Sequence, residues 1–200
     1  MADSSTREKL MDAALDLFSR KGYQATSVDE IAESIGIKGP NIYKYFKGKR
    51  GLFEELLSTT DKVYREKMGL SADMASEITD AEGFRHFTMT QIEYTIRDDT
   101  ARKMRKMFTI EQFRDKELAK MASEYQFSNI VEQYKSIFER LVKIGAMKDG
   151  DPEILALECV GPCTVLLQLC DREPERIGYA MEMIRRHTNS FIKTYFKDKA

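Results

Sequence analysis

The stretch SVDEIAESIGIKGPNIYKYF, residues 27–46, decides the fold of this chain. It opens with Ser27 and Glu30, whose spacing is that of a capping box at the start of a helix. Ala32 and Gly36 follow, a small residue for close helix packing and a glycine for a turn with positive φ. Apolar residues occupy the core positions of such a unit: Ile31, Ile35, Ile37, Ile42 and Tyr45. The stretch therefore predicts a helix-turn-helix.

Helices are also expected on both sides of this stretch. The pattern Ser5-Thr6-Arg7-Glu8 predicts the capping box of a first helix, and Gly22 is placed to end it. A further helix is expected to begin after Gly48. Residues 1–50 are therefore predicted to form one domain, a three-helix unit that contains the helix-turn-helix.

Residues 51–200 are predicted to form a helical body. Apolar periodicity indicates helices near 80–98, 101–109, 113–122 and 125–145. Asp151-Pro152 is a cap followed by a first-turn proline, so an apolar helix is expected from there to Cys170, kinked at Gly161-Pro162. A last helix is expected after Glu173-Pro174. The predicted fold class is all-α, with about nine helices.

Charge is concentrated in one place. The net charge of the 200 residues is -1, but residues 38–50 contain five Lys or Arg and no Asp or Glu. This pattern favours a polyanion contacted at one patch, although a solvated basic loop is the simpler alternative. No run of about 18 apolar residues occurs and the N-terminus is polar, so we expect neither a membrane helix nor a secretory signal, and a cytoplasmic location.

The sequence offers little for catalysis or metal binding. Only His86 and His187 are present, far apart, and no nucleophile–base or phosphate-loop pattern occurs. Cys159, Cys163 and Cys170 fall near one side of a helix among apolar residues, which favours buried thiols over a metal site. We therefore expect no catalytic residue, metal or cofactor. A helical adaptor for protein partners remains an alternative, but it leaves the basic segment unexplained.

The motif resembles that of a known family. Gly22-Tyr23, ATSVDEIA (25–32), GIKGPNIYKYFKGK (36–49) and Leu52-Phe53 are similar to the signature of the tetracycline-repressor (TetR) family, over about residues 7–58. The resemblance implies a DNA-binding transcriptional regulator, most often a repressor, that binds a palindromic operator as a homodimer and is released by a small-molecule effector. The dipeptide Lys38-Gly39 departs from the family pattern, and Gly39 offers no side chain for a base contact.

The resemblance, with helix geometry, assigns DNA contacts to the basic segment. The second helix of the motif would enter the major groove, where Asn41 suits adenine, Lys44 suits guanine and Pro40 suits a thymine methyl. The full set of expected DNA-binding residues is Thr26, Ser27, Lys38, Gly39, Pro40, Asn41, Tyr43, Lys44, Tyr45, Lys47 and Lys49. Of these, Thr26, Ser27, Tyr43, Lys47 and Lys49 are expected on phosphates, and Tyr45 either packs in the core or contacts a phosphate.

The start of the helix after Gly48 is unusual. A helix N-terminus prefers anions, yet Lys49 and Arg50 stand there with Lys47 just before. A bound phosphate would resolve this mismatch. Screening by solvent is the alternative.

Two further sets of residues follow from the expected body. The apolar helix that ends at Cys170 is followed by a helix in which apolar residues repeat every seven positions from Ile177. Together they predict either a four-helix interface between two chains or a pair of helices buried within one chain. The expected dimerisation residues are Val160, Cys163, Leu167, Ile177, Met181, Ile184, Thr188 and Phe191.

Aromatic and Met residues of the middle helices form either core or the lining of a site for an apolar or amphipathic effector. The expected ligand-binding residues are Phe87, Gln91, Tyr94, Met107, Phe108, Gln112, Tyr134 and Phe138.

Overall fold

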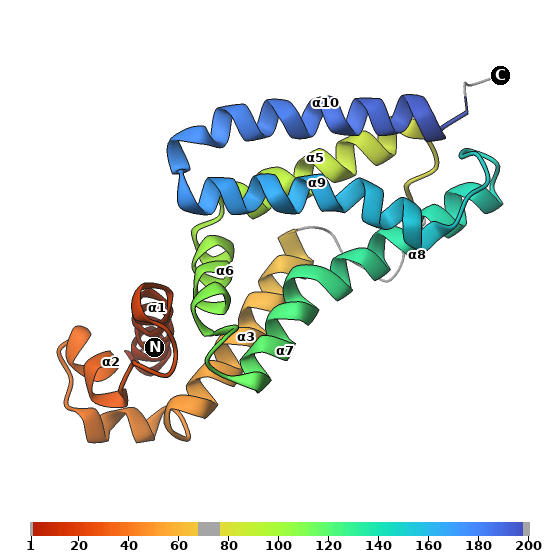
Figure 1. Cartoon of the computed structure of the whole chain (residues 1–200). Coiled ribbons are helices and arrows are strands. Elements are labelled where there is room, and N and C mark those ends of the chain that lie inside the picture. Colours follow the sequence, from red (N-terminus) through yellow and green to blue (C-terminus); the bar gives the residue numbers. More distant parts are fainter. Residues whose placement is uncertain (1, 68–76, 198–200) are drawn as a thin grey trace. The chain divides into compact units, whose positions relative to one another are not determined.

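The computed structural model describes residues 2–67 and 77–197, and these ranges are helical throughout apart from the turns and one isolated bridge between Met147 and Phe196. The chain folds as two compact units (Figure 1). Unit 1 comprises the described residues up to Arg65 together with Asp99–Ala122, and unit 2 comprises the described residues between Glu66 and Asp98 and those from Ser123 onward. The all-α fold class is confirmed.

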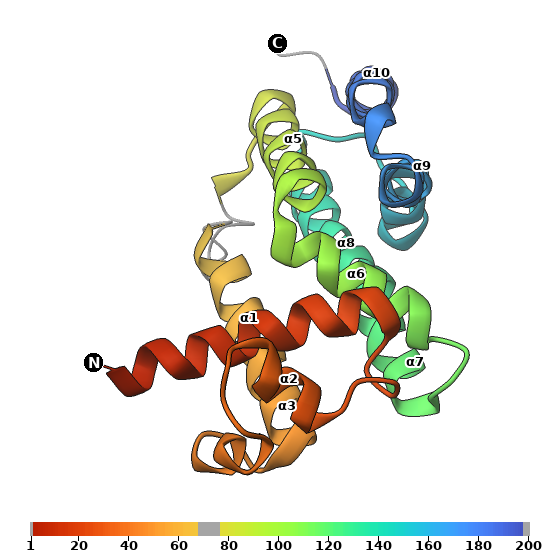
Figure 2. The ribbon, with the colours of Figure 1, turned by 90° about the vertical axis from the view of Figure 1, so that its left-hand side faces the viewer.

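Unit 1 contains α1, α2, a 3-10 helix η1, α3, α6 and α7. Their bounds are α1 Ala2–Lys21, α2 Val28–Ser34, η1 Gly39–Lys44, α3 Gly48–Lys67, α6 Asp99–Glu111 and α7 Lys116–Ser123. Figure 2 views α1, α2 and α3 from a second side. Helix α1 packs against both α2 and α6, so α6 lies with the N-terminal helices although it is distant in sequence. The compact units therefore differ from a boundary at residue 50.

Local chemistry sets most helix ends in unit 1. Ser27 accepts a hydrogen bond from the Glu30 amide, and the Glu30 side chain accepts one from the Ser27 amide, so the predicted capping box is formed. Gly22 ends α1 with φ 93° and Gly36 follows α2 with φ 76°, conformations that side chains other than glycine rarely adopt. The prediction for the start of α1 was wrong, because the helix already begins at Ala2 and Ser5 lies inside it.

The core of unit 1 brings the helix-turn-helix onto α1 and α3. The rings of Phe18, Tyr23 and Phe53 pack together, with 4.9 Å between the centroids of Tyr23 and Phe53. Ile31 and Ile42 are completely buried, one from each helix of the motif. Their burial fixes the orientation of η1 within the unit, and thus which of its residues reach the surface.

Unit 2 contains α5, a π-helical turn η2, α8, α9, a 3-10 turn η3 and α10. Their bounds are α5 Ala81–Arg97, η2 Glu124–Ser128, α8 Asn129–Lys143, α9 Pro152–Arg172, η3 Pro174–Arg176 and α10 Ile177–Tyr195. Helix α9 contacts both α8 and α10, and α10 also packs on α5. The cap by Asp151 and the first-turn proline of α9 are as predicted, and the helix continues through Pro162.

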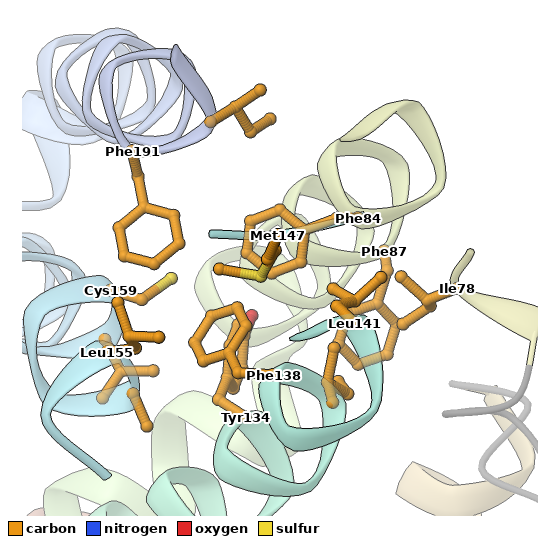
Figure 3. Close-up of a cluster of buried hydrophobic side chains, with 14 of the residues drawn as sticks. Ile78, Phe84, Phe87, Tyr134, Phe138, Leu141, Met147, Leu155, Cys159 and Phe191 are labelled. Atoms are coloured by element: carbon orange, nitrogen blue, oxygen red, sulfur yellow. The ribbon is translucent and has the colours of Figure 1, made fainter. Parts of the chain in front are cut away.

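Aromatic rings form the centre of unit 2. Phe84 of α5 lies 5.4 Å from Phe138 of α8 and 5.9 Å from Phe191 of α10, measured between ring centroids (Figure 3). A second cluster joins Ile92 and Ile96 of α5 to residues of α9 and α10. Helix α5 therefore fills the space between the other helices of the unit.

Within the described ranges, α9 alone has the length and hydropathy of a membrane-crossing helix, with a mean hydropathy of 1.6 over its most apolar window. Its Leu155, Ala156 and Cys159 belong to the core of unit 2. Core helices of folded proteins commonly have this composition, so the feature is weak support for a membrane span.

Candidate nucleic-acid interface

The turn of the helix-turn-helix is short and held by backbone hydrogen bonds. The amide of Ile37 donates to the carbonyl of Ala32 at 3.1 Å, and the amide of Gly36 donates to Glu33 at 2.9 Å. Ala32 is completely buried. Together these features bring α2 and η1 close across the turn, as the small residue and the glycine four positions later predict.

One face of η1 and its flanks is exposed. Lys38, Pro40 and Lys44 are exposed, Asn41 is half-buried, and Tyr43 is 65% exposed. In the part of the chain that the structure describes, the ammonium groups of Lys38, Lys44 and the neighbouring exposed Lys47 have neither a hydrogen bond nor an ion pair. This face is thus basic and open to solvent. The base contacts expected of Asn41, Lys44 and Pro40 stay predictions.

Gly39 does not belong to the exposed face, and the prediction that it contacts DNA is corrected. The residue is buried, and a Cβ atom built on it would lie 1.6 Å from Oδ1 of Asp29. The glycine therefore permits η1 to approach α2 closely. Its missing side chain is explained by this packing.

Thr26 is also a structural residue. Its side chain is 1% exposed, and its hydroxyl donates to the carbonyl of Gly22 at 2.8 Å. A buried hydroxyl with its proton already donated is poorly placed for a phosphate, so this expected contact is corrected. Ser27 is exposed, and its hydroxyl caps α2.

Glu30 completes the cap of α2 and also pairs with Lys21 of α1. The bond to Lys21, followed by those to the Ser27 amide and hydroxyl, lowers the pKa of Glu30 from 4.5 to about 2. The carboxylate is therefore charged at neutral pH and joins the ends of α1 and α2.

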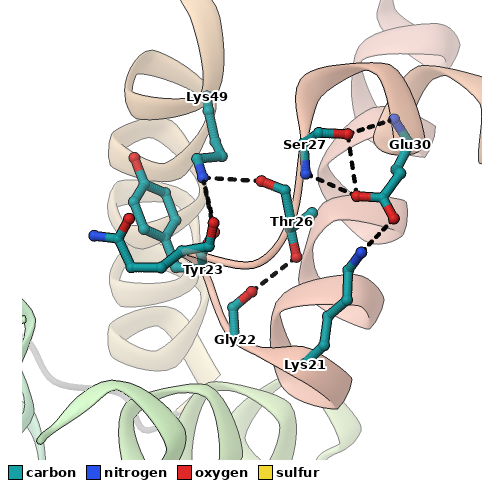
Figure 4. A network of polar contacts seen from close by, with 8 residues as sticks. Lys21, Gly22, Tyr23, Thr26, Ser27, Glu30 and Lys49 are labelled. Atoms are coloured by element: carbon teal, nitrogen blue, oxygen red, sulfur yellow. Dashed lines mark hydrogen bonds and ion pairs between the residues drawn. The ribbon is translucent and has the colours of Figure 1, made fainter. Parts of the chain in front are cut away.

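Lys49 points into unit 1 rather than toward a partner. Its Nζ donates to the carbonyls of Tyr23 and Thr26, both at 2.8 Å, and to that of Gln24 at 3.3 Å (Figure 4). The same ammonium lies 4.4 Å from the centroid of the Tyr23 ring. Burial lowers the pKa of Lys49, and the negative charge of Glu111 opposes that change. Lys49 thus holds the turn before α2, and a contact from it to a phosphate stays a prediction.

Arg50 likewise has partners inside unit 1. Its guanidinium donates two hydrogen bonds to Glu117 of α7, at 2.9 and 2.7 Å, and one to Glu54 at 2.7 Å. The bonds to Glu117 and then Glu54 raise the pKa of Arg50. The chain itself therefore compensates the cations at the start of α3, without the bound phosphate that the sequence suggested.

Tyr45 is half-buried, and its carbonyl accepts a hydrogen bond from Nη1 of Arg7 at 2.9 Å. The guanidinium of Arg7 also lies over the ring of Phe46, 4.7 Å from its centroid. Arg7 thus ties α1 to the end of η1, a role that nothing in the sequence indicates beyond a basic residue in the first helix.

The expected ligand-binding residues are divided between the two units. Met107, Phe108 and Gln112 belong to unit 1, on α6 or just after it, while the other five belong to unit 2: Phe87, Gln91, Tyr94, Tyr134 and Phe138. The structure therefore does not gather the eight into one compact unit. Met107 and Phe108 are buried in unit 1.

The expected residues of unit 2 include several buried polar groups. The hydroxyl of Tyr134 donates to Oγ1 of Thr88 at 3.3 Å, and Gln91, 6% exposed, donates to Gln133 at 3.4 Å. Burial, followed by the effect of Asp98, raises the pKa of Tyr94 to about 12. The buried side chains of Gln91 and Tyr134 thus supply uncharged polar groups within unit 2.

The expected dimerisation residues lie mainly in the core of unit 2, and their role in dimerisation stays a prediction. Val160 and Phe191 lie in the first core cluster, and Cys163, Leu167 and Ile184 lie in the second. Ile177 and Met181 pack against the second cluster, and Thr188 is 1% exposed. The seven-residue spacing identified an apolar face, but α5 of the same chain covers it.

Metal-binding chemistry finds no support in the described residues, where no group of three or more His, Cys, Asp or Glu could hold an ion. Cys159, Cys163 and Cys170 are free and buried, as the sequence predicts. Burial raises the pKa of the Cys163 thiol to about 12, so this group stays protonated at neutral pH.

Comparison with known proteins agrees with this geometry. Residues 10–56 match the model of the tetR family of bacterial regulatory proteins. A Bacillus subtilis strain 168 protein described as "Probable HTH-type transcriptional regulator YttP" is 25% identical over 194 residues, covering 97% of this chain and 90% of that protein. IcaR of Staphylococcus aureus, a negative transcriptional regulator of the biofilm operon icaADBC, is 41% identical over 49 residues, 24% of this chain and 26% of IcaR.

Among solved structures, SmeT, the repressor of the Stenotrophomonas maltophilia efflux pump SmeDEF, is similar over 99% of this chain and 94% of its own, with a TM-score of 0.71 and 18% identity. Its triclosan complex gives a TM-score of 0.72 at 19% identity, over 97% of this chain and 93% of its own. The fold and the exposed helix-turn-helix define a DNA-binding transcriptional regulator. Residues 10–56 are thus similar to the tetR family of bacterial regulatory proteins, and the fold of the described residues is similar to that of SmeT.

Proposed function

We propose that this chain is a ligand-responsive repressor that binds a palindromic operator as a homodimer and is released by a small apolar or amphipathic effector. The observation that carries the proposal is the basic face of η1, where Lys38, Lys44 and Lys47 lack partners in the described residues and stand beside exposed Pro40. Free ammonium groups attract phosphates and base edges because no internal carboxylate competes for them. Repression as the direction of control is supported by the names of IcaR and SmeT.

In this proposal the residues of the basic face of η1 have different roles in binding DNA. Asn41 and Lys44 read adenine and guanine in the major groove, and Pro40 contacts a thymine methyl. Lys47, with Tyr43, binds phosphates and fixes the register. Because Lys49 and Arg50 have internal partners, fewer phosphate contacts are available than the five basic residues of the segment suggest.

Dimerisation is assigned to the exposed apolar residues of α9 and α10. Ile154 and Val165 of α9 are 51% and 63% exposed, and Tyr179 of α10 is 50% exposed. A dimer aligns two recognition helices with the two halves of a palindrome, so affinity and symmetry both favour it. These residues replace the buried seam as the proposed interface.

The effector is proposed to bind within unit 2. Thr88, Gln91 and Tyr134 supply uncharged polar groups in an aromatic surrounding, which suits a largely apolar molecule with few polar atoms. The triclosan complex of SmeT supports a ligand of this kind for a protein of this fold. Binding would favour a conformation with lower DNA affinity and so release the operator, which is the reason for placing the protein in the cytoplasm with the chromosome.

The proposal is tested by selecting duplexes from a random DNA library with the purified protein and measuring their affinity in mobility-shift assays. We expect palindromic sequences, and a complex of two chains per site. Absence of binding at low salt as well as at physiological salt refutes the proposal. The apparent mass of the free protein should be twice 23.1 kDa, and Val165→Glu should reduce it, whereas Glu132→Gln, at an exposed position of α8, should not.

A further inference from the structure

Three acidic residues of the α6–α7 segment contact the region that precedes and follows the helix-turn-helix, all within unit 1. Oε1 of Glu111 accepts a hydrogen bond from the backbone amide of Gln24 at 3.2 Å. Oδ2 of Asp115 accepts from the side-chain amide of the same glutamine at 2.8 Å. Glu117 binds Arg50 in a two-bond pair. The segment thus binds both the turn before α2 and the start of α3.

Glu111 differs from the other two because it is completely buried. Its Oε2 atom has no hydrogen-bond partner among the described residues, and its ion pair with the guanidinium of Arg114 is long, at 4.0 Å. Burying a carboxylate with incomplete hydrogen bonding is unfavourable. An apolar side chain at this position, in line with Met104 and Met107 on α6, would avoid that cost. Packing alone therefore does not account for a glutamate here.

The turn between Gly22 and Thr26 lies between Glu111 and Lys49. Lys49 donates to three carbonyls of the turn, and Glu111 accepts from one of its amides, so donor and acceptor groups of the same turn are held by opposite charges. The charge of Glu111 also acts on that of Lys49. Gly22 makes the approach possible, because a Cβ atom there would lie 2.1 Å from Oε1 of Glu111.

This turn leads directly into Ser27, the cap of α2, and the position of α2 sets that of η1 through the buried contact at Gly39. We propose that Glu111 is a positioning residue for DNA binding: it fixes the turn Gly22–Thr26, and through it the recognition face, without touching DNA. The inference rests on the proposed DNA-binding function. It assigns to α6 a defined polar contact with the reading motif.

The test compares two neutral variants of similar size. Glu111→Met keeps the side-chain volume but removes the acceptor, whereas Glu111→Gln keeps an acceptor for the Gln24 amide. Met104→Ala, on the same buried face of α6, serves as the control for loss of packing. Each variant is assayed for affinity to a duplex selected by the wild-type protein, for the salt dependence of that affinity, for urea unfolding, and for hydrogen exchange of the Gln24 amide.

We expect Glu111→Met to lose about tenfold or more in affinity with an unchanged salt slope, since no phosphate contact is removed. Its Gln24 amide should exchange faster, while its unfolding midpoint stays at or above that of the wild type because the buried carboxylate is gone. Glu111→Gln should keep affinity within about threefold. Met104→Ala should lower the unfolding midpoint but keep Gln24 protection and affinity where it is folded.

Wild-type affinity in Glu111→Met, or equal losses in Glu111→Met and Glu111→Gln, would overturn the inference while leaving the proposed function intact. Unchanged exchange of the Gln24 amide in Glu111→Met overturns it as well, and this measurement needs no DNA. Failure of the wild-type protein to select any duplex refutes the proposed function itself, and with it the inference.

Discussion

Replacing Lys49 by Met separates the role that the structure gives this residue from the role that its position in a basic segment suggests. Methionine keeps a long apolar stem against Tyr23 but removes the ammonium. The carbonyls of Tyr23 and Thr26 then lose charge-assisted hydrogen bonds of 2.8 Å, and that of Gln24 loses a longer one at 3.3 Å. The matched control is Lys47→Met, because Lys47 is exposed and has no partner among the described residues.

A hydrogen bond to a charged group contributes about 1.5–3 kcal/mol. Lys49 is half-buried, so water can reach part of the site after the substitution, and we use the lower end of that range for the two short bonds. With the contact to the Tyr23 ring, worth about 0.5–1 kcal/mol, the free energy of unfolding should fall by about 3.5–4 kcal/mol. Lys47→Met should change it by less than about 0.5 kcal/mol.

Urea unfolding followed by circular dichroism measures the free energy of unfolding. Mobility shifts on a selected duplex at several salt concentrations measure the DNA affinity and its salt slope. Lys47→Met should lower the salt slope by about 0.9, the contribution of one phosphate contact. Lys49→Met should weaken binding with little change in slope. If Lys49→Met instead unfolds like the wild type and lowers the slope as Lys47→Met does, Lys49 is a phosphate ligand and the reasoning is refuted.

Three further outcomes are expected. Gly39→Ala should lower the free energy of unfolding by about 1–3 kcal/mol through overpacking against Asp29, and most of that loss should disappear in an Asp29→Ala background; an equal loss in both backgrounds contradicts the proposed clash. The pKa of Glu30 is depressed in the folded state, so its stabilising effect is present above about pH 4.5 and is lost as pH falls toward 2. Carboxyl NMR titration should find a pKa near 2, and Glu30→Gln should reduce the loss of stability at acid pH. A carboxyl pKa near 4.5 would argue against the cap and the ion pair. Lys44→Ala should relax base choice at one position of the selected site, with specific affinity falling more than affinity for random duplex; equal losses on both duplexes would remove Lys44 from the reading face.

Much of unit 1 was predictable because its signals are local. The capping box of Ser27 and Glu30 and the positive φ of Gly22 and Gly36 depend on residues within one turn of the chain. Such caps and turns can be predicted directly from the sequence, since short-range geometry leaves few alternatives. The exposed face around Lys44 follows from the same reasoning, because burial of Ile42 turns its neighbours outward.

What sequence patterns leave undecided has a different cause. The seam of Ile184 and Phe191 was correctly identified as an apolar face, but periodicity does not say whether a second chain or α5 covers it. Likewise, Phe87 and Phe108 look alike in sequence, yet they belong to different compact units. A pattern along one helix contains no information about which distant helix it meets.

One feature of the sequence points to Glu111, namely its position on α6. It lies seven residues after Met104 and four after Met107, so it continues the buried face of α6. A charged residue at such a position is rare unless it is paired, and therefore calls for a partner. The partner, the amide of Gln24, is 87 positions away in the sequence.

The sequence by itself determined the class of fold, the helix-turn-helix, its caps and turns, and the concentration of positive charge beside it, because each depends on residues close together in the chain. The tertiary structure decided how that charge is used. Of the five basic residues between 38 and 50, it leaves Lys38, Lys44 and Lys47 exposed and without partners among the described residues, and it pairs Lys49 and Arg50 with other groups of unit 1. The carbonyls that bind Lys49 belong to a turn more than twenty residues earlier, and Glu117, which binds Arg50, comes from α7. Only the folded chain brings these groups within hydrogen-bonding distance, and that distance distinguishes a cation that supports the motif from one free to meet DNA.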